Sequence, residues 1–189
     1  RDRSVSRGLG DVYKRQDLLD LSRLEETPDP DRCPRTDLHS AIVTSFMAHK
    51  GEAEDKHLDL VLDDRSVTGD DCYADMEPSD ASLVFDNLIE NAIMYTDEGS
   101  ILVTFEPRGH EIAVIVQDTG IGIPQTDQSR IFERFYRVDK ARSREVGGTG
   151  LGLSLVRHAV ERSKGRVSVK SNPGEGSQFT VCLLYTSPS

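Results

Sequence analysis

The stretch GGTGLGLSLV (residues 147–156) places four glycines within six positions and then turns apolar. Glycine runs let a backbone approach a bound group closely, often a phosphate. A dinucleotide fingerprint does not fit, because Gly148, Gly150 and Gly152 give G-x-G-x-G and no strand precedes them. A Walker A loop does not fit either, because Leu153 stands in place of its lysine. The run therefore predicts a helix N-terminus that either faces an anion or is packed closely.

The helices around this run can be predicted from apolar spacing and end signals. The pattern predicts helices over residues 17–26, 38–49 with Asp37 as N-cap, 79–95 with Ser79 as N-cap, and 151–163 with Gly165 as C′ residue. Strands are expected at residues 57–62, near 65–68, at 100–106 and at 112–118, followed by a hairpin around NPGEG. This order predicts an α+β domain, with helices on one face of a mostly antiparallel sheet.

Composition narrows the possible functions. The net charge of −10 argues against nucleic-acid binding, which usually requires a basic face. No apolar run approaches the roughly 20 residues of a membrane helix, so we expect no membrane contact by this segment. The three cysteines and five histidines show no zinc-ligand spacing.

Three further stretches carry candidate binding residues. DTGIGIP (118–124) places a carboxylate, Asp118, at the end of an apolar strand, where it could accept hydrogen bonds from an exocyclic amine or simply form a turn. FDNLIENAIMYT (85–96) places Asn87 and Asn91 one helical turn apart, as surface amides or as Mg²⁺ ligands. Residues 130–144 contain six basic and two acidic side chains, which would suit a cover for a polyphosphate or a solvated loop.

Four motifs in this order resemble the catalytic ATP-binding domain of bacterial sensor histidine kinases, in the Bergerat-fold ATPase superfamily. NLIENAIMYT resembles the N box, DTGIGIP the G1 box, IFERFYRVD (131–139) the F box and GGTGLGLSLV the G2 box. The resemblance implies a two-layer α/β sandwich with about five strands, about three helices and a long ATP lid over residues 124–146. It also implies a catalytic domain over residues 37–184, a linker over 28–36 and, at 17–27, the end of a dimerisation and phosphoacceptor hairpin. Residues 1–16 and 185–189 are expected to be a non-native or disordered leader and tail.

The resemblance also implies roles for individual residues. Asn91 would ligate Mg²⁺, Asn87 would support the phosphates and the metal, and Arg137 would contact the γ-phosphate. Asp118 would hold the adenine amino group with Ser177 behind it, and Phe132 and Phe135 would anchor the lid. The remaining expected nucleotide contacts are Tyr95, Gly120, Gly122, Ile123, Tyr136, Gly148, Thr149, Gly150, Leu151, Gly152 and Leu153.

The resemblance implies a protein-histidine kinase of a two-component system, homodimeric when full-length. ATP and Mg²⁺ would be its cofactors, and its partners would be the upstream hairpin of the same protein and a response-regulator receiver domain. The domain would be cytoplasmic, with a parent that could be an inner-membrane sensor.

Two departures leave alternatives open. Met94 replaces the basic residue that usually precedes the N-box tyrosine, and no phosphoacceptor histidine motif occurs, since LHSAI (38–42) lies inside the catalytic domain. The chain could therefore be a degenerate ATP-binding module or another Bergerat-fold ATPase. The second is disfavoured by the F box and by Asn87, where those enzymes place a catalytic glutamate.

Overall fold

The computed structural model describes residues 15–26, 29, 34–66, 72–138 and 150–185. Its main sheet has the strand order β2-β4-β5-β7-β6. The strands are β2 (Asp59–Asp63), β4 (Ser100–Arg108), β5 (Glu111–Asp118), β6 (Arg166–Asn172) and β7 (Gly176–Leu184). Neighbouring strands are antiparallel except β2 and β4, which are parallel. The strand β5 is central, as its nearly continuous apolar sequence predicts.

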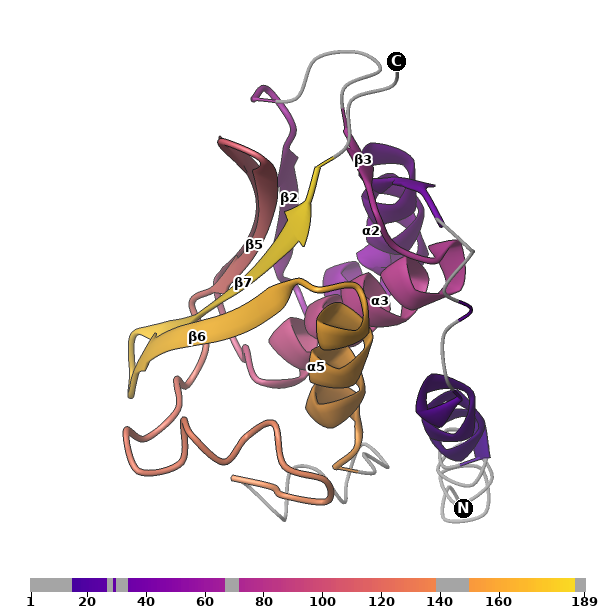
Figure 1. Cartoon of the computed structure of the whole chain (residues 1–189). Helices are drawn as coiled ribbons and strands as arrows, with labels where there is room; N and C mark the ends of the chain where they lie inside the picture. Colours follow the sequence, from indigo (N-terminus) through magenta and orange to yellow (C-terminus); the bar gives the residue numbers. More distant parts are fainter. Residues whose placement is uncertain (1–14, 27–28, 30–33, 67–71, 139–149, 186–189) are drawn as a thin grey trace.

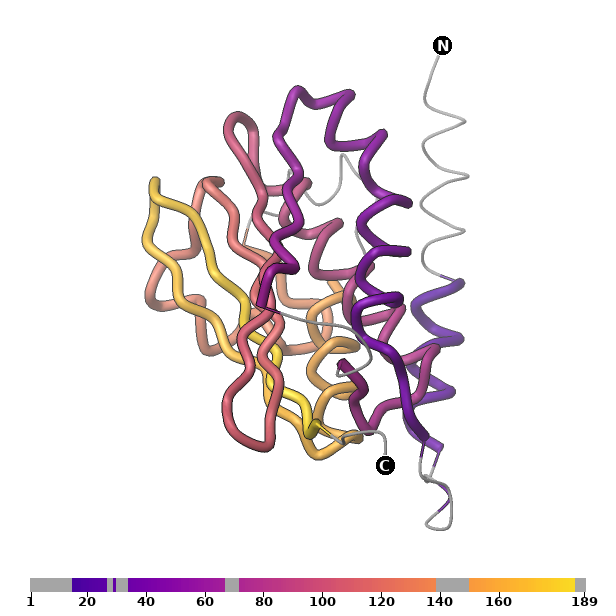
Figure 2. The backbone as a smooth tube through the Cα atoms, turned by 90° about the horizontal axis from the view of Figure 1, so that it is seen from above, coloured from indigo at the N-terminus to yellow at the C-terminus, as the bar shows by residue number. Residues whose placement is uncertain are grey.

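Three helices, α2 (Leu38–Asp55), α3 (Pro78–Met94) and α5 (Gly152–Arg162), cover one face of this sheet (Figure 1). Seen from above, the sheet and the helices form two layers (Figure 2). A two-stranded sheet of β1 (Thr36–Asp37) and β3 (Tyr73–Ala74) lies at the start of α2. The predicted α+β sandwich is therefore confirmed.

The core lies between the layers. The apolar stripe predicted for α3 is buried throughout and includes Phe85, Leu88 and Ile89. From the sheet, Ile101 and Val103 of β4 join the same cluster. Burying such side chains contributes about 1.5–3 kcal/mol each, so this contact is a main source of stability. Among the described residues, no helix is both long and apolar enough to cross a membrane.

Several helix ends differ from prediction. Asp37 does cap α2, since its carboxylate accepts from the Ser40 N–H at 3.2 Å, but the helix continues to Asp55. The N-cap of α3 is Glu77 and not Ser79, because Pro78 occupies the first helical position, which suits its fixed φ.

The end of α5 was also predicted wrongly by one position. Lys164 adopts the left-handed conformation (φ +61°) that we expected of Gly165. Gly165 is needed for another reason, because a Cβ there would lie 2.4 Å from the Cys182 carbonyl oxygen.

The predictions failed for the shortest strands. The strand expected near residues 65–68 is a turn at Arg65 and Ser66, and residues 67 and 68 lie outside the described part. The two-residue strands β1 and β3 have no sequence pattern long enough to detect.

Candidate functional site

Asp118 lies at the end of β5 and is almost completely buried, with 5% of its surface exposed. Its Oδ1 accepts hydrogen bonds from the Gly120 N–H at 2.9 Å and the Ser177 N–H at 3.2 Å. Burial raises the pKa of this carboxyl, and the two backbone donors oppose the rise. The fold therefore holds a strong hydrogen-bond acceptor in a partly dry environment, at a position fixed by two strands.

The G1 turn (residues 119–122) packs against the end of α3. The Ile121 N–H donates to the Tyr95 carbonyl at 3.0 Å. A Cβ on Gly120 would lie 2.2 Å from that same oxygen and 2.9 Å from both Asp118 Oδ1 and Thr96 Oγ1. Only glycine permits this approach, so Gly120 allows the DTGIGIP turn to pack directly against the end of the NLIENAIMYT segment. Thr96 also belongs to this contact, although no sequence motif marks it, and its buried Oγ1 has no hydrogen-bond partner among the described residues.

The turn is also joined to the β6–β7 hairpin. Gly122 has φ +73°, and a Cβ there would lie 2.1 Å from the Asn172 carbonyl oxygen. The Ile123 N–H donates to Ser171 Oγ at 2.8 Å, and Ser171 Oγ lies 2.8 Å from Ser177 Oγ. Ser177 therefore contacts Asp118 through its backbone, while its hydroxyl pairs with Ser171. Ser171 was not predicted, because nothing local in the sequence marks it.

Asn87 brings α3 to the start of α5. Its amide nitrogen donates to the Leu83 carbonyl at 2.7 Å, and its Oδ1 lies 2.9 Å from where a Cβ on Gly152 would be. Asn91 is half-buried one turn further along α3. The α5 helix begins after the buried Leu151, with no capping side chain from the described residues. The Asn87 amide oxygen therefore lies beside the start of α5.

Residues 124–138, the described part of the expected lid, form turns and bends without helix or strand. Phe132 packs edge-on against Phe179, with ring centroids 6.3 Å apart. Phe135 does not anchor the segment as expected, because it is 64% exposed. Its backbone does so instead, since its N–H donates to the Gly150 carbonyl at 2.8 Å. The apolar anchors are Ile131, which is buried, and Phe132.

The predicted F-box contacts lie at the end of this described segment. The Tyr136 hydroxyl donates to Asp127, and the Arg130 guanidinium lies 4.4 Å from the Tyr136 ring centroid. Arg137 is half-buried beside it. Gly148 and Thr149 lie outside the described residues.

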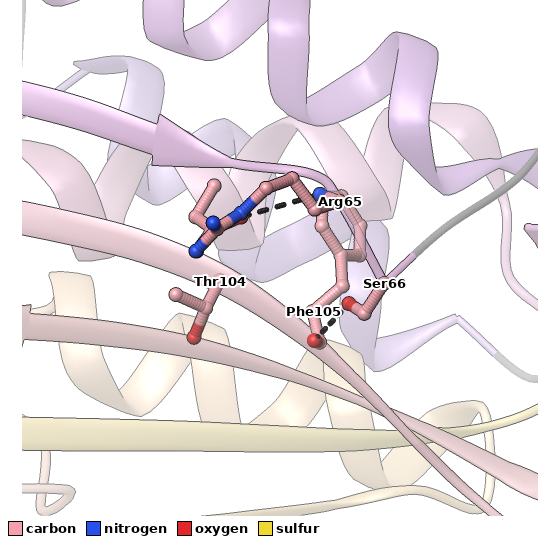
Figure 3. Close-up of a pocket in the computed structure, with 5 residues that line it drawn as sticks. Arg65, Ser66, Thr104 and Phe105 are labelled. Atoms are coloured by element: carbon pink, nitrogen blue, oxygen red, sulfur yellow. Dashed lines mark hydrogen bonds and ion pairs between the residues drawn. The ribbon is translucent and has the colours of Figure 1, made fainter.

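The nucleotide site expected here does not coincide with the hollow drawn in Figure 3. That hollow lies by the outer strand β2, and Asp63, Arg65, Ser66, Thr104 and Phe105 line it. It shares no residue with the candidate site. Among the described residues, no group of three or more His, Cys, Asp or Glu side chains could bind a metal. A metal at the site would therefore depend on amide oxygens and on oxygens of the ligand.

Comparison with protein families gives a match over residues 76–187 to the histidine kinase-, DNA gyrase B- and HSP90-like ATPases. The chain is 39% identical over 171 residues to the sensor-like histidine kinase SenX3 of Mycolicibacterium smegmatis, covering 88% of this chain and 43% of SenX3. It is 41% identical to the sensor histidine kinase RppB of Synechocystis, covering 88% of this chain and 36% of RppB. The chain thus spans less than half the length of these relatives.

Solved structures agree on the fold. Full-length ShkA in complex with AMPPNP gives a TM-score of 0.76 at 22% identity, covering 92% of this chain and 35% of ShkA. The solved chain of the mycobacterial sensor histidine kinase MprB gives a TM-score of 0.69 at 19% identity, covering 83% of this chain and 100% of that solved chain. The chain therefore belongs to the histidine kinase-, DNA gyrase B- and HSP90-like ATPases and corresponds to the ATP-binding catalytic domain of the sensor histidine kinases among them.

Proposed function

We propose that this chain binds Mg²⁺-ATP between the end of β5 and the start of α5. In the longer protein, the γ-phosphoryl group is then transferred to a histidine on an upstream helix hairpin. The observation that carries the proposal is the buried Asp118 carboxylate, held by the Gly120 and Ser177 N–H groups. The Gly120 and Gly122 positions let the turn after Asp118 pack directly against α3 and the β6–β7 hairpin, which fixes the carboxylate beside the proposed base site.

Asp118 accepts a hydrogen bond from the adenine amino group in this proposal. Gly120, Gly122 and Ile123 form the floor beneath the base, and Tyr95 lies beside it. Ser177 supports Asp118 through its backbone N–H. Thr96 Oγ1, which has no hydrogen-bond partner in the described part of the chain, would be satisfied by a polar ligand or water in this region.

The phosphates extend toward α5 in this proposal. The backbone of residues 148–153 and the N-terminal dipole of α5 favour an anion there. Asn91, supported by Asn87, would hold Mg²⁺ through an amide oxygen, and Arg137 and Tyr136 approach from the lid. The donor set suits Mg²⁺, a hard cation that takes protein oxygens together with substrate phosphates. When bound, the metal would neutralise charge on the phosphates.

The binding proposal is tested by titrating Mg²⁺-AMPPNP into the Asp118→Asn variant. We expect the affinity to fall about 10- to 100-fold, because a hydrogen bond to a charged acceptor is worth roughly 1.5–3 kcal/mol. The matched control is Asp63→Asn on β2, which removes one carboxylate outside the site. Equal affinity for Asp118→Asn and wild type would refute the proposed base contact.

Phosphotransfer needs a separate test because of Met94, which ends α3 where the N box usually has a basic residue. A separately produced hairpin domain of a sensor histidine kinase, carrying its histidine, is incubated with this chain and Mg²⁺-ATP. Phosphohistidine on that hairpin supports the kinase. Nucleotide binding without transfer supports a degenerate module, and steady hydrolysis without any acceptor supports another ATPase. If the chain is a kinase, we propose that the phosphoryl group passes from the histidine to a response-regulator receiver domain. The full-length protein would be a homodimer that presents the hairpin, and the reaction would occur in the cytoplasm.

A further inference from the structure

Three buried polar side chains form a row across the main sheet. Asp118 of β5 pairs with Ser177 of β7, and Ser177 pairs with Ser171 of β6, in neighbouring antiparallel ladders (Figure 1). Directly opposed residues place their side chains on the same face of a sheet. Two positions away in the β5–β7 ladder, Val116 and Phe179 are paired and belong to the core under the helices. The row therefore lies on the helix-facing side of the sheet, where the nucleotide is proposed to bind.

The Ser171 hydroxyl makes three hydrogen bonds, and together they fix the position of its proton. A serine hydroxyl has one proton to donate and two lone pairs that accept. Its oxygen lies 2.9 Å from the Gly176 carbonyl oxygen, which can only accept, so Ser171 donates there. One lone pair accepts the Ile123 N–H at 2.8 Å. The other lone pair faces Ser177 Oγ at 2.8 Å, so Ser177 is the donor in that contact.

This order of donors determines what Ser177 can offer to a ligand. Its single hydroxyl proton points at Ser171, so the Ser177 oxygen can only accept hydrogen bonds from other groups. Asp118, beside it in the row, is also an acceptor. Its Oδ1 takes the Gly120 and Ser177 N–H groups, which leaves Oδ2 for a ligand. Two hydrogen-bond acceptors therefore lie side by side at the end of β5 and the start of β7.

We propose that Ser171 is a positioning residue that makes the base site selective for an exocyclic amino group, because it keeps the Ser177 proton directed away from the ligand. Asp118 Oδ2 then accepts one hydrogen of the adenine 6-amino group, and Ser177 Oγ accepts the other. A 6-oxo group carries lone pairs in place of these hydrogens, so it meets two acceptors and binds poorly. This selectivity rests on the proposed nucleotide site and adds a determinant outside the DTGIGIP turn.

The surroundings of the two hydroxyls restrict where the Ser177 proton can go. Asp118, Ser177 and Ser171 are 5%, 7% and 9% exposed, so water does not readily replace a lost partner. Gln128 Nε2 donates to the Ile123 carbonyl at 3.0 Å and to the Ser171 carbonyl at 2.9 Å, which holds the backbone on both sides of the Ser171 hydroxyl. Without that hydroxyl, the Ser177 proton turns to the Asp118 carboxylate or to the ligand, and either choice weakens the preference for an amino group.

The test measures base selectivity in the full chain. Mg²⁺-AMPPNP and its inosine analogue, in which a 6-oxo group replaces the 6-amino group, are each titrated into wild type and Ser171→Ala. Selectivity is the dissociation constant of the inosine analogue divided by that of AMPPNP. We expect this ratio to fall about three- to ten-fold in Ser171→Ala, because the amino group loses one neutral hydrogen bond and the oxo group gains a donor.

Two further variants separate the direction of the hydroxyl proton from simple packing. Gln128→Met has a side chain of similar length but no donors for the Ile123 and Ser171 carbonyls. It should lower the affinity for both nucleotides by the same factor and leave the ratio unchanged. Ser177→Ala removes the hydroxyl that Ser171 orients, so its own ratio should fall about two- to five-fold. Adding Ser171→Ala to Ser177→Ala should then change the ratio no further.

Each outcome supports or overturns the role of Ser171. An unchanged ratio in Ser171→Ala, with both nucleotides still bound, would overturn that role and leave the proposed function standing. An equal fall in Gln128→Met would assign the effect to backbone position and would also overturn it. If circular dichroism shows that Ser171→Ala does not fold, Ser177→Ala decides, since a wild-type ratio there means that Ser177 does not read the base. If wild type binds neither nucleotide, the proposed function fails and the selectivity with it.

Discussion

Gly120 offers a direct test of how the G1 turn is fixed against α3. In Gly120→Ala, the new Cβ would lie 2.2 Å from the Tyr95 carbonyl oxygen, a backbone atom that cannot rotate away. The turn must move by roughly 1 Å to restore ordinary contact. That movement weakens the Ile121 N–H bond to Tyr95 and the Gly120 N–H bond to Asp118.

The expected loss of stability follows from these contacts. Two hydrogen bonds contribute about 0.5–1.5 kcal/mol each, and the overpacking adds about 1–3 kcal/mol. The sum is about 2–6 kcal/mol. For a domain of this size, each kcal/mol lowers the midpoint of thermal unfolding by about 2–4 °C.

Urea and thermal unfolding followed by circular dichroism provide the measurement. The control is Gly51→Ala, in the exposed interior of α2, where nothing lies within 4 Å of the new Cβ. Alanine there favours the helix, so we expect a gain of about 0.4–1 kcal/mol. If Gly120→Ala unfolds within about 0.5 kcal/mol of wild type, the reasoning about this close approach is wrong.

Three other predictions concern charge and packing. The hydrogen bond with Glu90 raises the pKa of His49 to about 9. The free energy of unfolding, measured by urea titration, should therefore fall by about 1–3 kcal/mol as the pH rises from 6.5 through 9. His49→Gln should abolish that fall. Burial raises the pKa of Asp118, so Asp118→Asn should raise the unfolding midpoint at pH 7, and the gain should shrink as acid protonates the carboxyl. Phe132→Ala should cost about 1–2 kcal/mol, whereas the exposed Phe135→Ala should change stability by less than about 0.5 kcal/mol.

The elements that could be predicted are those whose pattern is local. The apolar stripe of α3, the long runs of β4 and β5 and the hairpin turn at Gly174 all carry their signal within a few residues. The parallel pairing of β2 with β4 could not be predicted, because its register depends on contacts between segments about 40 positions apart. The left-handed backbone of Lys164 could not be predicted either, because glycine usually takes this conformation at the end of a helix. The glycine here, Gly165, is instead needed one residue later, where it packs closely against β7.

The same distinction applies to the site. The position of Asp118 followed from its place after an apolar strand, and the structure does bury it there. The neighbours that shape its surroundings, Thr96 and Ser171, come from other segments and have no motif of their own. Phe135 was predicted wrongly, because an aromatic residue in a turn can fix the chain through its N–H while its ring stays in water.

The order of the strands has a consequence for biosynthesis. Of the described strands of the main sheet, β7 is translated last, yet it lies between β5 and β6 and supplies the Ser177 N–H to Asp118. While the ribosome is still making residues 176–184, the inner edges of β5 and β6 have no partner to pair with, which leaves the nascent chain open to pairing with other chains. The domain can therefore complete its sheet only after translation of this last strand, and a message truncated before it yields a chain without a formed site.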